Sequence, residues 1–190
     1  MQGETTDRER ADQLLALRCQ LGERAAFEEL VRRWAGSLHG YALKLSNDPE
    51  LAADLTQEVW LRVLQGLGKL GDVARFRSWL FGIAHRTFMD RLRSRYAVPE
   101  QTPVDWDALA ATDNGDGDDE HERLQALTTG LQSLPLVERE VLVLFYLDDL
   151  SLADIAAALG IPAGTVKSRL FRARALLRHQ LRPEETRHGQ

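Results

Sequence analysis

The chain has 190 residues, of which 44% are hydrophobic and 28% charged, enough for one domain or two small ones with a packed core. No apolar run reaches the length of a membrane span, and the first residues, MQGETTDRER, lack the apolar stretch of a secretory signal peptide, so we expect a cytoplasmic protein. The net charge of −5 argues against nucleic-acid binding by the chain taken as a whole.

The charges are, however, unevenly distributed along the chain. Residues 100–122 hold nine acids and no Lys or Arg, which leaves 24 basic and 20 acidic groups elsewhere. Residues 75–95 have six Arg against one Asp, and residues 163–182 have one Lys and five Arg with no acid. Because a phosphate backbone responds to the local field, these two basic segments are candidates for nucleic-acid binding.

Helix-forming residues dominate the N-terminal part, which predicts four helices in an all-α fold. The helices are expected at about 7–21, 23–46, 49–65 and 73–96. Pro49 is suited to the first turn of the third helix, and Gly66, Gly68 and Gly71 predict a loop before the fourth. Cys19 is the single cysteine, so an internal disulfide and a cysteine-based metal site are excluded. We interpret it as a small buried apolar residue, with a redox sensor as the alternative.

The third predicted helix is amphipathic, with an apolar stripe of Ala52, Leu55, Val59 and Val63. Asp54, Gln57 and Leu61 face the other way, with Glu58 at the edge. From this segment alone the favoured interpretation is a polar face in water. Leu61 on the polar side is a weak hint of a protein partner.

The fourth predicted helix combines cations with aromatic rings. Its inward stripe is expected to be Phe76, Leu80, Ile83, Ala84 and Thr87. Its outward face is expected to carry Ser78, Gly82, His85, Arg86, Met89 and Arg93, with Trp79 at the border. Cations for phosphates and flat rings for unstacked bases are what single-stranded DNA binding requires. The alternative is a core aromatic cluster that includes Trp79, Phe81 and Phe88, with solvated arginines.

Residues 97–120 predict a flexible acidic linker. They contain Pro99, Pro103, Gly115, Gly117 and the run DNGDGDDE, a composition that cannot bury enough apolar surface to fold alone. The linker would join two small helical domains, at 10–96 and 121–183.

The C-terminal part predicts two helices and then a helix-turn-helix. The first helix is expected near 121–132, and the second begins at Ser133 and contains the buried run VLVLFYL before a turn at Asp148. In residues 151–181, Ser151 and Asp154 form a capping box that starts a helix. Gly160 can adopt the left-handed cap that ends it, and Pro162 can open the next helix.

The last helix has two distinct faces. Val166, Leu170, Ala173 and Leu177 share the side that should pack inward. Ser168, Phe171, Arg172 and Ala175 point the opposite way, flanked by Thr165, Lys167, Arg169 and Arg174. A phenylalanine among cations on an outer face suits a helix in a DNA major groove. The alternative is a helical hairpin whose charged face is solvated or holds a protein.

Nothing in the sequence predicts catalysis, a cofactor or a metal centre. The five His are scattered without metal-ligand spacing, and no phosphate loop or nucleophile motif is present. Asp118, Asp119 and Glu120 could bind a divalent cation weakly, but we favour their assignment to the acidic linker.

The order of these features resembles the sigma-70 superfamily, in its extracytoplasmic-function (ECF) branch. The segments DLTQEVWLRV, FRSWLFGIAHRTFMDRLR and IPAGTVKSRLFRARALLR look like three family signatures in the correct order, over about residues 10–182. The resemblance implies an all-α protein with a region 2 domain at 10–96 and a region 4 domain at 121–183. It also implies binding to core RNA polymerase and to promoter DNA, commonly with a cognate anti-sigma factor as a further partner.

The resemblance also implies roles for individual residues. Asp54, Gln57 and Glu58 match the pattern that docks on the clamp region of the largest polymerase subunits. The loop at about 66–76 and the helix after it match the segment that melts and reads the −10 element, with Arg75, Arg77, Trp79, His85, Arg86 and Arg93 as its candidate DNA contacts. The last helix matches the reader of the −35 element, with Thr165, Lys167, Ser168, Arg169, Phe171, Arg172 and Arg174 as its candidates. One departure is Arg86, where the family usually has Asn.

The main rival is a two-domain transcriptional regulator with a helix-turn-helix and a sensory or dimerisation domain. Such a protein would bind duplex DNA alone and would not need polymerase. The basic, aromatic segment at 74–96 argues against it, because that segment indicates a second nucleic-acid surface and not a ligand pocket.

Overall fold

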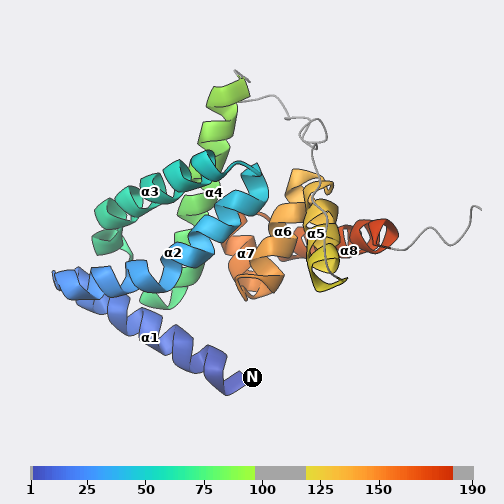
Figure 1. Cartoon of the computed structure of the whole chain (residues 1–190). Helices are drawn as coiled ribbons and strands as arrows, with labels where there is room; N and C mark the ends of the chain where they lie inside the picture. The colour runs from blue at the N-terminus through green and yellow to red at the C-terminus, as the bar shows by residue number, and fades with distance from the viewer. Residues whose placement is uncertain (1, 97–118, 182–190) are drawn as a thin grey trace, which may run out of the picture.

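The structure is a computed structural model that describes residues 2–96 and 119–181. Within these two ranges the regular structure is entirely helical, which confirms the predicted all-α fold (Figure 1). We call residues 2–96 the N-terminal half and residues 119–181 the C-terminal half. Residues 97–118, most of the predicted linker, lie outside the described residues, and Asp119 and Glu120 already belong to a helix.

The N-terminal half contains four α-helices and two short 3-10 turns. They are α1 (Gln2–Gln20), α2 (Arg24–Ser46), α3 (Pro49–Gly66), η1 (Leu67–Lys69), η2 (Val73–Arg75) and α4 (Phe76–Tyr96). The turn between α2 and α3 shows why these helices begin and end where they do. Asn47 adopts a left-handed conformation, and the Asp48 side chain accepts a hydrogen bond from the Leu51 amide at 3.1 Å. Pro49 then occupies the first turn of α3, as predicted.

The core of the N-terminal half lies where α2, α3 and α4 meet. The predicted inward stripes of α3 and α4 are buried throughout. Trp34 on α2 packs edge-on against Phe76 and Phe81, with ring centroids 6.4 and 5.9 Å away. Phe81 and Phe88 are buried as well, so these two rings belong to the core, as the alternative interpretation held.

The C-terminal half consists of α5 (Asp119–Gln132), α6 (Leu136–Tyr146), α7 (Leu152–Leu159) and α8 (Ala163–Gln180). Most of α6 is buried on all sides, as its apolar run predicted. Its start was predicted wrongly. The helix begins at Leu136 after Pro135, and the Ser133 hydroxyl donates to the Gly130 carbonyl at the end of α5 instead of capping α6.

The two halves pack against each other. In Figure 1, α7 lies beside α4, and α6 lies beside α2. Charged residues are part of this contact, because the buried Arg139 and Glu140 of α6 form hydrogen bonds with α2. The arrangement therefore brings together elements that are more than 50 residues apart in the sequence.

Two smaller expectations can be compared with the structure. No helix in the described ranges is both long enough and apolar enough to cross a membrane. Cys19 is half-buried and packs against the core of the N-terminal half. Burial raises the pKa of its thiol, which disfavours the reactive thiolate that a redox sensor needs.

Candidate nucleic-acid interface

The helix-turn-helix of the C-terminal half forms as its local sequence predicts. The Ser151 hydroxyl oxygen accepts a hydrogen bond from the Asp154 amide at 3.1 Å, which caps the start of α7. Gly160 ends α7 with φ 65° and ψ 32°, a left-handed conformation that glycine adopts without strain. Pro162 then precedes α8 directly. These caps fix the turn that orients α8.

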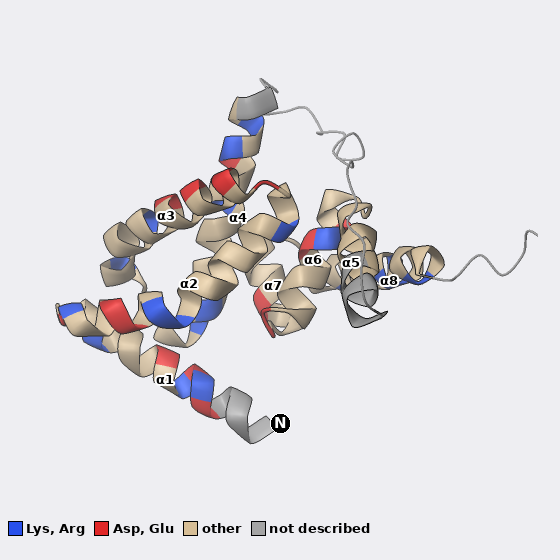
Figure 2. Cartoon of the chain, viewed as in Figure 1, with Lys and Arg blue, Asp and Glu red and all other residues tan. Residues whose placement is uncertain are grey.

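One face of α8 packs against the core, and the opposite face is exposed. Val166, Leu170 and Ala173 are buried, and Leu177 is half-buried. Phe171 is 75% exposed, and Lys167, Ser168 and Arg172 are exposed beside it. Thr165 and Arg169 lie half-buried at the border. Figure 2 shows Lys and Arg, and no Asp or Glu, along this helix.

Two arginines of α8 have intramolecular partners that the sequence did not reveal. A guanidinium nitrogen of Arg172 lies 3.5 Å from a carboxylate oxygen of Glu138, whose side chain is buried in α6. The guanidinium of Arg174 lies over the rings of Phe145 and Tyr146, at 5.9 and 5.6 Å from their centroids. Both contacts link exposed arginines of α8 to side chains of α6.

The candidate polymerase-binding residues lie along α3. Asp54 and Gln57 are exposed, in agreement with the predicted outward face. Glu58 is half-buried and pairs with Arg62 at 2.7 Å and with Arg91 of α4 at 3.6 Å. Leu61 and Leu64 are exposed on the same helix. The side of α3 that carries Asp54 and Gln57 is thus accessible, whereas Glu58 also ties α3 to α4.

Three of the six candidate −10 residues are exposed. Arg75 pairs with Asp72 at 3.7 Å, Arg93 pairs with Asp90 at 3.5 Å, and Arg86 is exposed on α4. Trp79 is half-buried. Its indole packs so closely over Gly66 that a Cβ there would lie 3.1 Å from the ring, which explains a glycine at that position.

The other two candidates, Arg77 and His85, turn toward the C-terminal half. Arg77 donates from Nη2 to the Asp148 carbonyl at 2.9 Å and lies 5.1 Å from the centroid of the Trp34 ring. The Nδ1 of His85 donates to the Glu140 carboxylate at 2.8 Å. The prediction of an outward face was wrong for Ser78 and Gly82, which are buried because α7 covers this side of α4.

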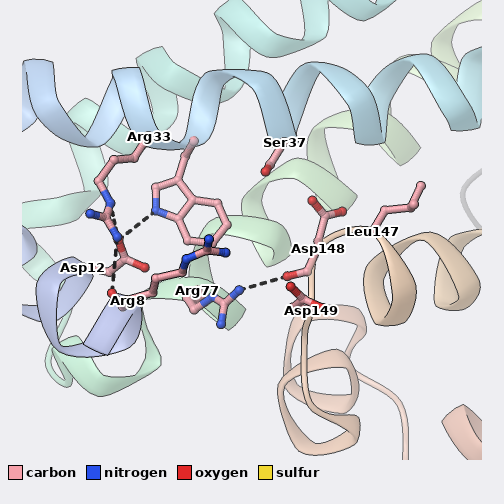
Figure 3. Close-up of a pocket in the computed structure, with 9 residues that line it drawn as sticks. Arg8, Asp12, Arg33, Ser37, Arg77, Leu147, Asp148 and Asp149 are labelled. Carbon is pink, nitrogen blue, oxygen red and sulfur yellow. Dashed lines mark hydrogen bonds and ion pairs between the residues drawn. The ribbon is translucent and has the colours of Figure 1, made fainter. Parts of the chain in front are cut away.

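A polar cavity of about 300 Å³ lies at the junction of the two halves (Figure 3). It is lined by Arg8, Asp12, Arg33, Trp34, Ser37, Arg77, Leu147, Asp148 and Asp149. Burial raises the pKa of Asp148 to about 7, against the opposing effects of the Arg77 charge and the Ser37 hydrogen bond. Burial likewise raises the pKa of Asp12, against the opposing effects of Arg33 and Trp34.

The described residues contain no cluster of three His, Cys, Asp or Glu side chains that could hold a metal ion. The side chains of Asp118, Asp119 and Glu120 lie outside the described part of the chain, so the structure does not test the weak cation site considered for them.

Two family models match the chain. The model for sigma-70 region 2 matches residues 30–97, and the model for sigma-70 region 4 matches residues 124–177. These two matches correspond to the N-terminal helices α2 to α4 and to the C-terminal helices α5 to α8.

Named relatives agree with these matches. The chain is 36% identical to the ECF RNA polymerase sigma factor SigM of Mycobacterium tuberculosis, over 89% of this chain and 84% of that protein. It is 30% identical to the RNA polymerase sigma-H factor of Pseudomonas aeruginosa, over 90% of this chain and 94% of that protein. It is 37% identical to the ECF RNA polymerase sigma factor SigE of Mycolicibacterium smegmatis, over 84% of this chain but only 64% of that longer protein.

Two solved structures share the fold. One is CnrH in complex with the cytosolic domain of CnrY, with a TM-score of 0.67 and 27% identity over 90% of this chain and 97% of that one. The other is the sigma factor RpoE in complex with the anti-sigma factor NepR from Bartonella quintana. Its TM-score is 0.63, with 25% identity over 84% of this chain and 98% of that one.

Proposed function

The chain belongs to the sigma-70 family, in its ECF branch, and from this premise we propose that it binds core RNA polymerase and directs transcription initiation at promoters whose −10 and −35 elements it reads. The N-terminal half corresponds to region 2 and the C-terminal half to region 4. The proposed domains are residues 10–96 and 121–183, joined by the acidic linker predicted at 97–120, of which the last two residues belong to α5.

The observation that carries this proposal is the outer face of α8. Phe171 and three polar or cationic neighbours, Lys167, Ser168 and Arg172, project from a helix whose other face is buried. A helix presented in this way by a capped helix-turn-helix fits the major groove, where cations contact bases or phosphates and an aromatic ring can contact a thymine methyl. We assign this face to the −35 element, with Thr165, Arg169 and Arg174 at its border.

We assign polymerase docking to the exposed side of α3, through Asp54 and Gln57, with Glu58 at its edge. The −10 element would be read by α4 and the turn before it. Its candidate contacts are Arg75, Arg77, Trp79, His85, Arg86 and Arg93. Exposed arginines on α4 support this assignment, because cations on a helix track the phosphates of a single strand.

Family membership favours this function over a regulator that binds duplex DNA alone, because the chain matches both sigma regions in order. Sigma factors are transcription initiation factors, and we propose that this one has no catalysis of its own and acts in the cytoplasm. We also propose an anti-sigma factor as a partner, since one of the solved relatives was crystallised with a protein of that kind.

The test is reconstitution with core RNA polymerase from the same source, followed by run-off transcription on genomic fragments. Initiation at defined start sites that requires both the chain and core polymerase supports the proposal. Specific binding of the isolated chain to duplex fragments, without any polymerase-dependent transcript, would instead support the rival regulator.

A further inference from the structure

The segment that joins α3 to α4, residues 67–75, has an inner and an outer side, and we call it the α3–α4 loop. On the inner side Leu67 is buried, and Leu70 and Val73 pack against the core of the N-terminal half. On the outer side Lys69 and Arg75 are exposed. The loop therefore presents two cations to solvent while its apolar side chains face the protein.

The regular structure of the loop is too short to be stable alone. It consists of two 3-10 turns of three residues each, η1 and η2. The Asp72 side chain caps η2 by accepting a hydrogen bond from the Ala74 amide at 3.0 Å. The N-cap of η1 is Gly66, which has no side chain that could do the same. The conformation of η1 must therefore be supported from elsewhere.

That support comes from the last residue of α1. The Nε2 atom of Gln20 donates to the Leu67 carbonyl at 3.1 Å and to the Leu70 carbonyl at 2.8 Å. Both acceptors are carbonyl oxygens, so the amide must present its NH2 group, which has two N–H donors. Leu67 is the first residue of η1 and Leu70 follows its last. One side chain thus holds η1 at both of its ends.

The helix α1 is itself fixed to the rest of the N-terminal half. Asp12 of α1 is 1% exposed, accepts a hydrogen bond from Nε1 of Trp34 at 3.2 Å and pairs with Arg33 at 2.9 Å. Glu9 pairs with Arg77 of α4 at 3.5 Å. In Figure 1, α1 passes beside the segment that follows α3. Gln20 therefore reaches the loop from a helix that is anchored to both α2 and α4.

Neither the family match nor the sequence pattern pointed to Gln20. The match to sigma-70 region 2 begins at residue 30, so α1 precedes the matched residues. Gln20 is 47 and 50 residues away in sequence from its two acceptors. Only the tertiary structure brings its amide to the loop.

We propose that Gln20 is a positioning residue for opening of the −10 element, because its amide holds the α3–α4 loop in the conformation that places Lys69 against the phosphates of the separated strand. The proposal rests on the proposed function above, which assigns this loop and α4 to the −10 element. Gln20 acts through the loop and does not touch DNA, since its side chain is half-buried and its NH2 group faces the two carbonyls.

The physical reason is preorganisation. Opening base pairs costs free energy, which contacts with the separated strand must offset. A loop that is ordered in advance loses little entropy when it binds the strand, so its contacts contribute more to opening. Without the Gln20 donors the two carbonyls would turn toward water, and the loop would have to be ordered while the strand is bound.

Gln20→Met tests the proposal because it keeps the length of the side chain and removes both N–H donors. We expect transcription from a duplex promoter, found in the run-off assay above, to fall about tenfold or more, since two hydrogen bonds are lost. The same promoter with non-complementary strands over the −10 element should restore transcription to within about twofold of the wild type, because its base pairs no longer have to be opened. Affinity for core polymerase should not change.

Gln13→Met is the matched control. Gln13 lies on the same face of α1 two turns earlier, and it lines a small cavity together with Val73 and Ala74 of the loop. The substitution removes an amide beside the loop but keeps both hydrogen bonds to η1. We expect wild-type transcription from both templates. A loss equal to that of Gln20→Met would overturn the role of the two hydrogen bonds.

The outcomes separate this proposal from the proposed function. A wild-type chain that initiates on neither template counts against the function itself. If the wild type is active, wild-type activity of Gln20→Met on the duplex overturns the positioning role alone. An equal loss on both templates, or a loss of affinity for core polymerase, overturns it too, because general damage to the fold would give that result.

A double-mutant cycle tests whether Gln20 acts through Lys69. Lys69→Ala should also reduce transcription from the duplex, since it removes an exposed cation from the outer side of the loop. In the Lys69→Ala background, Gln20→Met should cost less than about twofold, because residues that act as a unit have non-additive effects. Independent losses that multiply in the double variant would overturn the placement of Lys69 by Gln20.

Discussion

The guanidinium of Arg172, on the outer side of α8, lies 3.5 Å from the buried carboxylate of Glu138 on α6. The carboxylate can orient this arginine before DNA arrives, and preorganised side chains lose less entropy on binding. The same pairing would cost some free energy if Arg172 had to leave Glu138 to reach a base.

Arg172→Ala should relax the sequence preference at one or two positions of the −35 element. A base-reading arginine contributes about 1–3 kcal/mol of discrimination, which corresponds to roughly 5- to 150-fold between the preferred base and others. The measurement is transcription from a promoter library randomised in the −35 element, with folding checked by circular dichroism. Full retention of the −35 preference would show that Arg172 serves only as a phosphate or structural anchor.

Arg174→Ala should weaken binding to all promoters alike. Its guanidinium lies over Phe145 and Tyr146 at the border of the reading face, where it is placed to meet phosphate. Loss of one phosphate contact should reduce the slope of log affinity against log salt by about 1. The same promoter library and a salt titration test this expectation, and a changed base preference would assign Arg174 to base reading.

Asp54→Lys should weaken binding to core polymerase and leave the melting temperature unchanged, because Asp54 is exposed on α3. Glu50→Lys, at an exposed position in the first turn of the same helix, is the matched control and should bind almost normally. Glu58→Lys should lose both binding and stability, since it also breaks the pairs with Arg62 and Arg91. Unchanged affinity of both Asp54→Lys and Glu58→Lys for core polymerase would show that the docking site does not lie on α3.

The packed arrangement should be favoured by low pH. Burial at the junction raises the pKa of Asp148 to about 7 from 3.8, so the packed state binds one more proton than the separated state between these values. Its stability is therefore fully present below about pH 4, falls as pH rises, and levels off above about pH 7.

The radius of gyration of the free chain, measured by small-angle X-ray scattering between pH 5.5 and 8, tests this dependence. The charged and polar groups that face Asp148 are Arg8, Asp12, Arg33, Ser37, Arg77 and Asp149. Asp148→Asn should flatten the part of the profile that Asp148 causes. An unchanged slope in this variant would assign the dependence to another group.

The sequence alone determined the features that depend on residues three or four positions apart. The cap between Ser151 and Asp154, the left-handed Gly160 and the buried stripe from Val166 to Ala173 all formed as predicted. Helix periodicity and capping are local, so a single segment contains all the information they need. The start of α6 was missed because Pro135 and Ser133 both allow a helix start nearby.

Only the tertiary structure decided what lies opposite each face. Periodicity placed Ser78 and Gly82 together on α4, but their burial depends on α7, which begins 70 or more residues later in the sequence. Glu140 gave no signal in the sequence, since its donors Tyr41 and His85 come from two other helices. A helix pattern shows which side chains share a face, whereas the packing of distant helices determines whether that face meets water, protein or DNA.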